Sequence, residues 1–312
     1  MSGKTGFNKK RPVPPYPGSR EKGKESLVKI AAIQCEPHIG DKAHSVNEGL
    51  KLIAKAGRQG AKLIVLPELS NTGYLYNSRE EAFALAELVP HGPTTQEWIA
   101  MAKRYDAYIC AGITEREGNR VYNSVAIVGP HGHIGTYRKT HLWNEEKLWF
   151  EPGDRGFPVF ELPFGRIGCR ICYDAWFPEV TAIYAAQGAD IICDSTNWVV
   201  VDPLQTLDKP TAAYTGQALS LMYSVYTVCA DRIGTERGCT FIGNSCIISP
   251  IGEFVAGPGS PDNPEIVLAE VNVVSARYRN WSELNSHFTD RRTDLYDWYL
   301  GYDPETKRKL KS

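Results

Sequence analysis

The chain has 312 residues, of which 42% are hydrophobic, and its 35 basic and 36 acidic side chains leave a formal net charge of -1. This length allows one large hydrophobic core or two small ones. The balanced charge, with neither a basic stripe nor an aromatic-basic repeat, argues against nucleic acid as a partner, and no apolar stretch reaches the length of a membrane-spanning helix.

The segment 1–26 is polar and contains several prolines and a surplus of lysine and arginine. Because such a segment cannot bury enough apolar surface to fold alone, we predict a flexible N-terminal tail over 1–26, which a partner subunit could order. It lacks the apolar run of a signal peptide, so the eight cysteines of the chain are expected to be reduced thiols. Both features favour a cytoplasmic protein.

Strands and helices alternate along the rest of the chain, and the same order occurs twice. The first block is expected to contain strands at 29–35, 62–66, 108–113, 122–128 and 134–138, the last two as a hairpin, with a helix ending at Gly57 and another starting at a capping box on Thr94. The second is expected to contain strands at 166–171, 190–194 and 227–230, helices after Pro178 and near 213–224, and a hairpin ending at Ala256. No linker interrupts the blocks, so we predict one domain of mixed α and β structure over 27–300 and a C-terminal tail over 301–312.

Two of the expected strands end in side chains of opposite charge. The apolar run 63–66 is followed, after one proline, by Glu68, and the strand that ends at Arg138 is followed by Lys139. A carboxylate and an ammonium at strand ends are candidates for acid-base chemistry. A purely structural ion pair between Glu68 and Lys139 is the alternative.

A third strand, 166–171, runs into an abrupt turn at Cys172, and a helix is predicted to begin at Pro178. Such a junction exposes the turn residue at the carboxyl end of a sheet. The unpaired backbone N–H groups beside it can bind an oxyanion and lower the pKa of a thiol from its free value of about 8.5. On its own, Cys172 could equally be one more buried cysteine.

The same strand contains two further residues that need an explanation. Cys169 should face away from Cys172, because strand side chains alternate, so a redox or zinc site at this Cys-x-x-Cys is not expected. The remaining cysteines and histidines show no tetrahedral ligand spacing, and we expect neither a metal nor another cofactor. Arg170 is a charged residue in a strand that is expected to be buried, and it needs a buried carboxylate partner, which the sequence does not identify.

Three motifs occur in the order Leu66-Pro67-Glu68, Tyr137-Arg138-Lys139-Thr140-His141-Leu142 and Cys172-Tyr173-Asp174. A later block has Gly243-Asn244-Ser245 followed by Pro250-Ile251-Gly252. In this order the motifs resemble the nitrilase superfamily of carbon-nitrogen hydrolases, and the resemblance extends from about residue 28 to residue 296. It implies an α/β fold, as a four-layer α-β-β-α sandwich, and a Glu-Lys-Cys triad.

The resemblance implies a role for each member of the triad. Cys172 is the expected nucleophile, and Glu68 is the group that takes the thiol proton and passes it to the leaving amine. Lys139 and the backbone N–H of Tyr173 are expected to stabilise the oxyanion. Glu68, Lys139 and Cys172 are therefore the predicted catalytic residues.

Two residues near the lysine leave alternatives open. Many relatives have a second glutamate after the lysine, and we assign Glu146 to this catalytic position, with Glu145 as the alternative match. His141 shares a strand face with Lys139 and invites a Cys-His dyad, although a supporting hydrogen bond fits the family better.

Further residues are expected to line the substrate pocket. Tyr74 follows the proposed base, Asn197 and Trp198 end the strand after the nucleophile helix, and Trp176 lies four residues after Cys172. Each could instead be a packing residue. Several relatives that act on carboxylate-bearing substrates have arginine at the position of Trp176, and an indole cannot make that bidentate contact. An aromatic face favours an apolar or cationic group, and the segment resembles the N-carbamoylputrescine amidase branch.

We therefore predict a thiol-dependent hydrolase that cleaves a non-peptide C–N bond of a small neutral or cationic amide or N-carbamoyl compound. The reaction would pass through a thioester acyl-enzyme and release ammonia. A nitrilase with the same triad is the alternative activity. A catalytically silent binding protein on the same fold is the alternative of another class.

The resemblance also implies self-association, as a homodimer or a higher homo-oligomer. In the family, subunits pair through the helix after the nucleophile and through the C-terminal segment. Here Val180, Ile183, Tyr184 and the aromatic run 296–300 could supply that surface, although the run could also fold back on its own domain.

Overall fold

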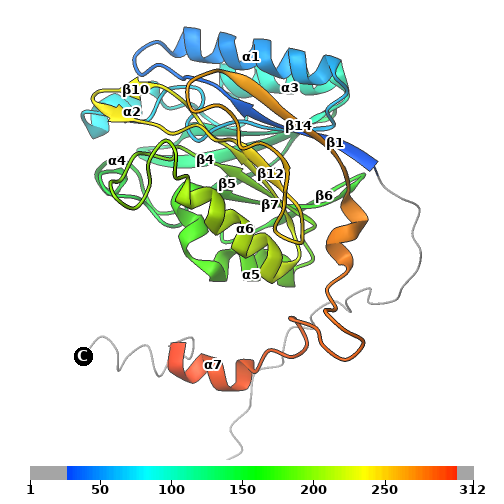
Figure 1. Ribbon diagram of the computed structural model, residues 1–312. Coiled ribbons are helices and arrows are strands. Elements are labelled where there is room, and N and C mark those ends of the chain that lie inside the picture. Colours follow the sequence, from blue (N-terminus) through cyan, green and yellow to red (C-terminus); the bar gives the residue numbers. More distant parts are fainter. Residues whose placement is uncertain (1–26, 301–312) are drawn as a thin grey trace, which may run out of the picture. The chain divides into compact units, whose positions relative to one another are not determined.

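The computed structural model of the chain describes residues 27–300, and the two predicted tails lie outside the described residues (Figure 1). Residues 27–277 belong to one unit and residues 278–300 to a second. The second unit contains helix α7, Thr293–Leu300. Of the helices in 27–300, none combines the length and the apolar composition that crossing a bilayer needs.

Two six-stranded mixed sheets form the centre of the first unit. The first has the strand order β14-β1-β2-β3-β4-β5, with β14 at Glu265–Asn272, β1 at Leu27–Gln34, β2 at Leu63–Val65, β3 at Tyr108–Glu117, β4 at Arg120–Gly129 and β5 at Gly132–Arg138. The second has the order β13-β12-β9-β8-β7-β6, with β13 at Phe254–Ala256, β12 at Cys246–Ile248, β9 at Tyr226–Ala230, β8 at Ile191–Ser195, β7 at Gly165–Ile171 and β6 at Val159–Leu162. In each sheet three parallel strands are flanked by antiparallel ones.

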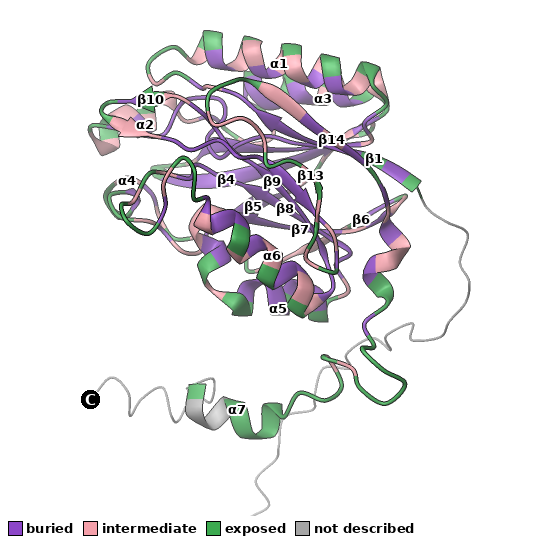
Figure 2. Cartoon of the chain, viewed as in Figure 1, coloured by how far each residue is buried: buried purple, intermediate pink, exposed green. Residues whose placement is uncertain are grey.

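Helices cover the outer faces of both sheets (Figure 1). The helices of the first unit are α1 at Lys42–Arg58, α2 at Arg79–Leu85, α3 at Pro93–Tyr105, α4 at Glu146–Trp149, α5 at Pro178–Ala186 and α6 at Thr211–Tyr223. One apolar core lies between the sheets and includes Val65 and Ile171, and a second joins α1 and α3 to the first sheet through Ile53 and Trp98. A third core contains residues of α6 and β12. The strands between the helices are largely buried, whereas the helices are exposed on one side (Figure 2). The predicted four-layer α-β-β-α sandwich is confirmed.

The hairpin predicted around residues 129–132 is present, with Gly129 opposite Gly132. The strand pattern did not identify β14, which pairs antiparallel with β1 along its whole length. It also did not identify β6, α2 or the small two-stranded sheet of β10, Thr235–Glu236, and β11, Cys239–Thr240. The positions of the site-bearing strands β2, β5, β7 and β8 agree with the predictions to within one or two residues.

The predicted capping box at Thr94 is wrong. Helix α3 begins at Pro93, with Gly92 at the N-cap and no side-chain cap. Proline suits this first helical position because its fixed φ is already helical. The hydroxyl of Thr94 instead donates to the Glu87 carboxylate at 2.6 Å, which takes it away from the helix end.

Asp194 is the partner that Arg170 needs. The two residues are opposite each other on the parallel strands β7 and β8, and Arg170 Nε donates to Asp194 Oδ2 at 2.8 Å. Nη1 of Arg170 also donates to the Thr181 hydroxyl of α5 at 2.7 Å. Burial raises the pKa of Asp194 to about 6 although Arg170 opposes the shift. The pair therefore joins the nucleophile strand to its neighbour and to the covering helix.

The predicted association surface on α5 needs a correction. Val180 and Tyr184 are buried against their own subunit, with 1% and 0% exposure, and cannot form a surface. Only Ile183 of the three predicted residues is exposed, at 39%. The face that α5 presents to solvent is therefore narrower than its sequence indicated.

Candidate active site

Glu68 lies just past the end of β2 with no exposed surface. Its Oε1 accepts hydrogen bonds from Lys139 Nζ and from Asn123 Nδ2, each at 2.6 Å. Its Oε2 has no hydrogen-bond partner among the described residues. Burial, only partly offset by Lys139, raises the pKa of Glu68 to about 8. A carboxyl in this state can exchange a proton near neutral pH.

Lys139 follows β5 and is held between two carboxylates. Its ammonium donates to Glu68 at 2.6 Å and to Glu146 Oε1 at 2.7 Å. Although burial opposes the charged form, Glu146 and Glu68 hold the pKa of Lys139 above its ordinary value. Glu146 is 4% exposed, whereas Glu145 is exposed, so the structure brings Glu146 rather than Glu145 to the lysine.

Cys172 begins a short 3-10 helix, Cys172–Trp176, directly after β7. Its φ of 46° is in the left-handed region, which is strained for a residue with a side chain and is found at functional turns. Burial and the charge of Glu68 raise the pKa of the Cys172 thiol well above its ordinary value, and Lys139 and the backbone N–H of Asn197 only partly oppose them. The expected lowering of the thiol pKa is therefore wrong, and a proton acceptor is needed to form the thiolate.

Three of the predicted pocket residues lie around this group. Tyr74 donates its hydroxyl proton to Glu146 Oε1 at 2.6 Å. Asn197 Nδ2 donates to the backbone carbonyl of Glu68 at 3.0 Å, and its Oδ1 is without a hydrogen-bond partner in the described part of the chain. Trp198, 3% exposed, belongs to the apolar cluster against which Cys172 packs.

Trp176 and Tyr173, the latter expected to bind the substrate through its backbone N–H, lie nearer the surface. The indole of Trp176 is 40% exposed. The ring of Tyr173 makes edge contacts with Trp143 and Phe177, at centroid distances of 4.9 and 5.2 Å. Trp143, Tyr173 and Phe177 therefore form one aromatic group that includes the residue directly after Cys172.

His141 contacts the carboxylate of Asp174. Its Nδ1 is 2.8 Å from Asp174 Oδ1, and its ring stacks on Phe177 at a centroid distance of 3.8 Å. This geometry agrees with a supporting hydrogen bond and gives the Cys-His dyad no support. Sequence reasoning did not identify the role of Asn123 at Glu68. The available signal was an amide inside a strand, β4, that is buried over most of its length.

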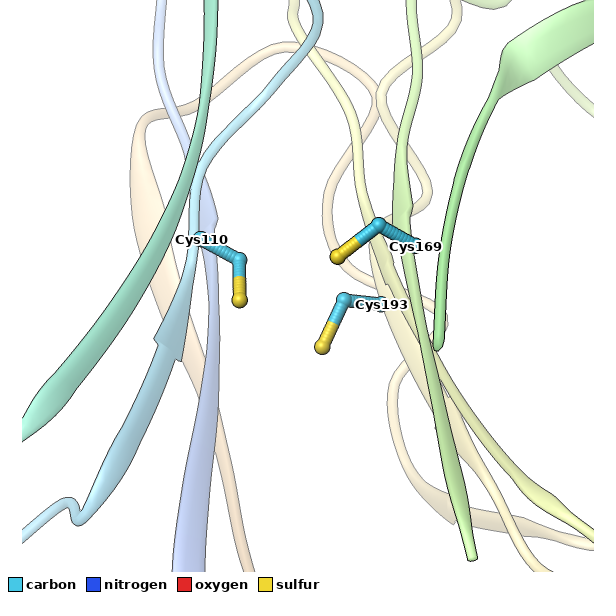
Figure 3. A group of neighbouring side chains, drawn as sticks. All are labelled: Cys110, Cys169 and Cys193. Atoms are coloured by element: carbon cyan, nitrogen blue, oxygen red, sulfur yellow. The ribbon is translucent and has the colours of Figure 1, made fainter. Parts of the chain in front are cut away.

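Cys169 lies in the core between the sheets, together with Cys110 of β3 and Cys193 of β8 (Figure 3), and Cys172 packs against the same core. The three Sγ atoms are all within 4.8 Å of one another. They are fully buried in an apolar cluster, where a charged metal-thiolate complex would lack polar groups to stabilise it. We interpret the three thiols as small apolar packing groups.

Comparison with known proteins identifies the family of the chain. Residues 29–280 match the model of the carbon-nitrogen hydrolase family. The chain is 42% identical to the nitrilase of Pyrococcus abyssi, over 86% of this chain and 99% of that protein, and 33% identical to the N-carbamoylputrescine amidase of Solanum lycopersicum, over 90% and 97%. The solved amidase of Nesterenkonia sp. has a TM-score of 0.72 at 22% identity, over 88% of this chain and 97% of that one. The chain belongs to the carbon-nitrogen hydrolase family of the nitrilase superfamily, and it is a carbon-nitrogen hydrolase.

Proposed function

We propose that the chain hydrolyses a small neutral or cationic amide or N-carbamoyl compound through a thioester on Cys172, with release of ammonia. The observation that carries this proposal is the buried group of Glu68, Lys139 and Glu146 beside a strained cysteine. Glu68 offers an oxygen without a hydrogen-bond partner in residues 27–300 and a pKa raised to about 8. These are the properties that a proton acceptor for a thiol needs.

In the acylation step, Glu68 takes the thiol proton and the sulfur of Cys172 attacks the carbonyl carbon. The resulting oxyanion is stabilised by the Lys139 ammonium and the backbone N–H of Tyr173. Glu68 then gives its proton to the nitrogen, the C–N bond breaks, and ammonia leaves. Glu146 and Tyr74 keep the lysine charged and in place through their 2.7 and 2.6 Å hydrogen bonds.

In the deacylation step, Glu68 takes a proton from a water molecule that attacks the thioester carbon. The C–S bond breaks and the proton returns to the sulfur, so one water is consumed for each ammonia released. For an N-carbamoyl compound the acyl group still carries one nitrogen, so it leaves the sulfur as a carbamic acid, which loses carbon dioxide to give an amine or ammonia. No redox change occurs in either half-reaction.

A nitrile is the second candidate substrate, because the relative with 42% identity is named a nitrilase. The relative from tomato is named an N-carbamoylputrescine amidase, which favours a carbamoyl compound. Ammonia release from matched amides, ureas and nitriles tests both. Product from amides or ureas supports the proposal, and product from nitriles alone supports the second candidate. A folded protein that releases ammonia from none of them would favour the silent binding protein.

The pH dependence of turnover should follow Glu68. Since the acceptor must be ionised and burial raises the pKa of Glu68 to about 8, we expect kcat/KM to increase as the pH rises through this region. The acid limb should lie well above the ordinary glutamate value of about 4.3. A pH-rate profile with a neutral amide, which does not titrate itself, measures this limb. A limb near pH 4 would contradict the role of Glu68.

The preference for neutral or cationic substrates should depend on Trp176. The wild-type protein should hydrolyse neutral ureas about a hundredfold faster, in kcat/KM, than matched N-carbamoyl amino acids, because no arginine is available at this position to hold a carboxylate. Trp176→Arg should narrow that ratio, and its 40% exposure leaves room for the charge. Trp176→Phe is the control and should keep the ratio. A wild-type preference for the carboxylated substrates would refute this interpretation.

We further propose that the protein is a homodimer or a larger homo-oligomer that contacts its copies through α5, α6 and the C-terminal segment. Ile183 and Tyr214, 39% and 48% exposed, are apolar side chains on these helices. The aromatic run 296–300 belongs to the second unit, and the side chains of 297–299 lie outside the described residues.

We also propose that residues 27–300 form the hydrolase domain. The eight free cysteines support a reducing compartment, the cytoplasm.

Light scattering should give a mass at least twice that of the 34.7 kDa chain at micromolar concentration. Ile183→Lys should lower this mass, because a charge in an apolar contact is costly to desolvate. Ile251→Lys, at a residue that is 64% exposed outside these helices, should not. A monomeric wild-type protein would exclude the dimer.

A further inference from the structure

Asp174 is a fully buried carboxylate two residues after the proposed nucleophile. Its Oδ1 accepts hydrogen bonds from the backbone N–H of His141 at 3.0 Å and from Nδ1 of the same residue at 2.8 Å. Its Oδ2 accepts from the hydroxyl of Tyr137 at 2.7 Å and from the backbone N–H of Ile171 at 3.0 Å. An ionised carboxylate only accepts hydrogen bonds, and its two oxygens can accept from all four of these donors.

These donors come from the two segments that carry the proposed catalytic groups. Ile171 is the last residue of β7 and directly precedes Cys172. Tyr137 and His141 stand two residues before and two residues after Lys139, at the end of β5. Because β5 and β7 belong to different sheets, one buried side chain joins the cysteine turn of one sheet to the lysine segment of the other.

We propose that Asp174 is a positioning residue that fixes the sulfur of Cys172 relative to the Lys139–Glu68 pair, with His141 and Tyr137 as its partners. This inference rests on the proposed function. The strained backbone of Cys172 persists only if neighbouring contacts hold it, and the bond from Ile171 acts immediately before this residue. The stack on Phe177 fixes the ring of His141 in turn.

The proposal predicts a specific effect of the His141 donor. In His141→Asn, the amide Nδ2 can replace the ring Nδ1 as a donor, whereas His141→Leu has similar bulk and no donor. We expect the leucine variant to lose about 10- to 100-fold in kcat with little change in KM, since a small misplacement of reacting groups has effects of this size. The asparagine variant keeps a donor to Asp174, and the loss in the leucine variant is attributed to the missing donor. The asparagine variant should therefore retain activity within about threefold of the wild type.

Two variants complete the design. His133→Leu is the matched control, because His133 lies on β5, the strand that precedes His141, and bonds to Thr136 rather than to Asp174. It should keep wild-type activity. Tyr137→Phe removes the other side-chain donor to Asp174 and should also lower kcat. This variant replaces His141→Leu in the test if His141→Leu does not fold. Thermal unfolding midpoints check that each compared variant is folded.

The alkylation rate of Cys172 by iodoacetamide gives a readout that needs no substrate. We expect it to be about tenfold slower in His141→Leu than in His141→Asn, because the displaced thiol loses its proton acceptor. Thus a wild-type protein without hydrolase activity would refute the proposed function and still leave this ratio measurable. Equal alkylation and turnover in wild type, His141→Leu and Tyr137→Phe would overturn the proposal. Equal loss in His141→Leu and His141→Asn would also overturn it, since His141 would then act in the chemistry itself.

Discussion

Replacement of Cys172 by alanine should lower kcat by about 10⁴-fold or more, because the attacking sulfur is removed and no thioester can form. The fold should persist, since alanine is smaller than cysteine and the residue is only half-buried. Ammonia release, measured with the thermal unfolding midpoint, separates loss of chemistry from loss of structure.

Cys239→Ala is the matched control for this variant. Cys172 and Cys239 are the two cysteines of intermediate burial, and the six others are buried. Cys239 lies on the β10-β11 hairpin and should be dispensable for turnover. Full activity in Cys172→Ala, or its loss in Cys239→Ala alone, would end the assignment of the nucleophile.

Replacement of Glu68 by glutamine should lower kcat by about 10²- to 10⁴-fold, the usual contribution of a general acid-base group. The amide has the shape of the carboxyl but cannot accept the thiol proton, whose removal is difficult because the pKa of Cys172 is raised. KM should change less than kcat, since Lys139 keeps its bond to Glu146 at 2.7 Å. Steady-state kinetics on a single amide or urea measure both constants.

Glu145→Gln is the control for Glu68→Gln, because Glu145 is exposed and its charge can be removed without disturbing the buried group. It should leave kcat unchanged. Substantial turnover in Glu68→Gln would mean that another group takes the thiol proton. His141, the alternative base suggested by the sequence, would then be the first candidate.

The sequence predicts the placement of Glu68, Lys139 and Cys172 at strand ends, because each lies just past a predicted strand, Glu68 and Lys139 in the first sheet and Cys172 in the second. The order of the motifs indicated the family, and the resemblance to the family predicted the four-layer sandwich. By contrast, the pairing of β14 with β1 joins distant parts of the chain, which a local pattern cannot reveal. The capping box failed because the hydroxyl of Thr94 bonds to Glu87, a partner outside its own helix.

Buried polar partners were the least predictable part of the site. Arg170 required a carboxylate, yet Asp194 became its partner only through the parallel register of β7 and β8. The thiol pKa was expected to fall because of nearby N–H donors, but burial and the charge of Glu68 outweigh them. Desolvation depends on how the whole core packs, and a sequence pattern does not contain that quantity.

The central claim is a thioester on Cys172, and its most direct test is to trap that intermediate during turnover. Wild-type protein mixed with the best amide or urea of the panel is acid-quenched within one turnover and analysed by intact mass and peptide mapping. We predict an acyl adduct on the peptide that contains Cys172, sensitive to hydroxylamine, with one ammonia released for each adduct formed. Steady ammonia release with no adduct on Cys172, or with the adduct on another residue, would contradict the mechanism.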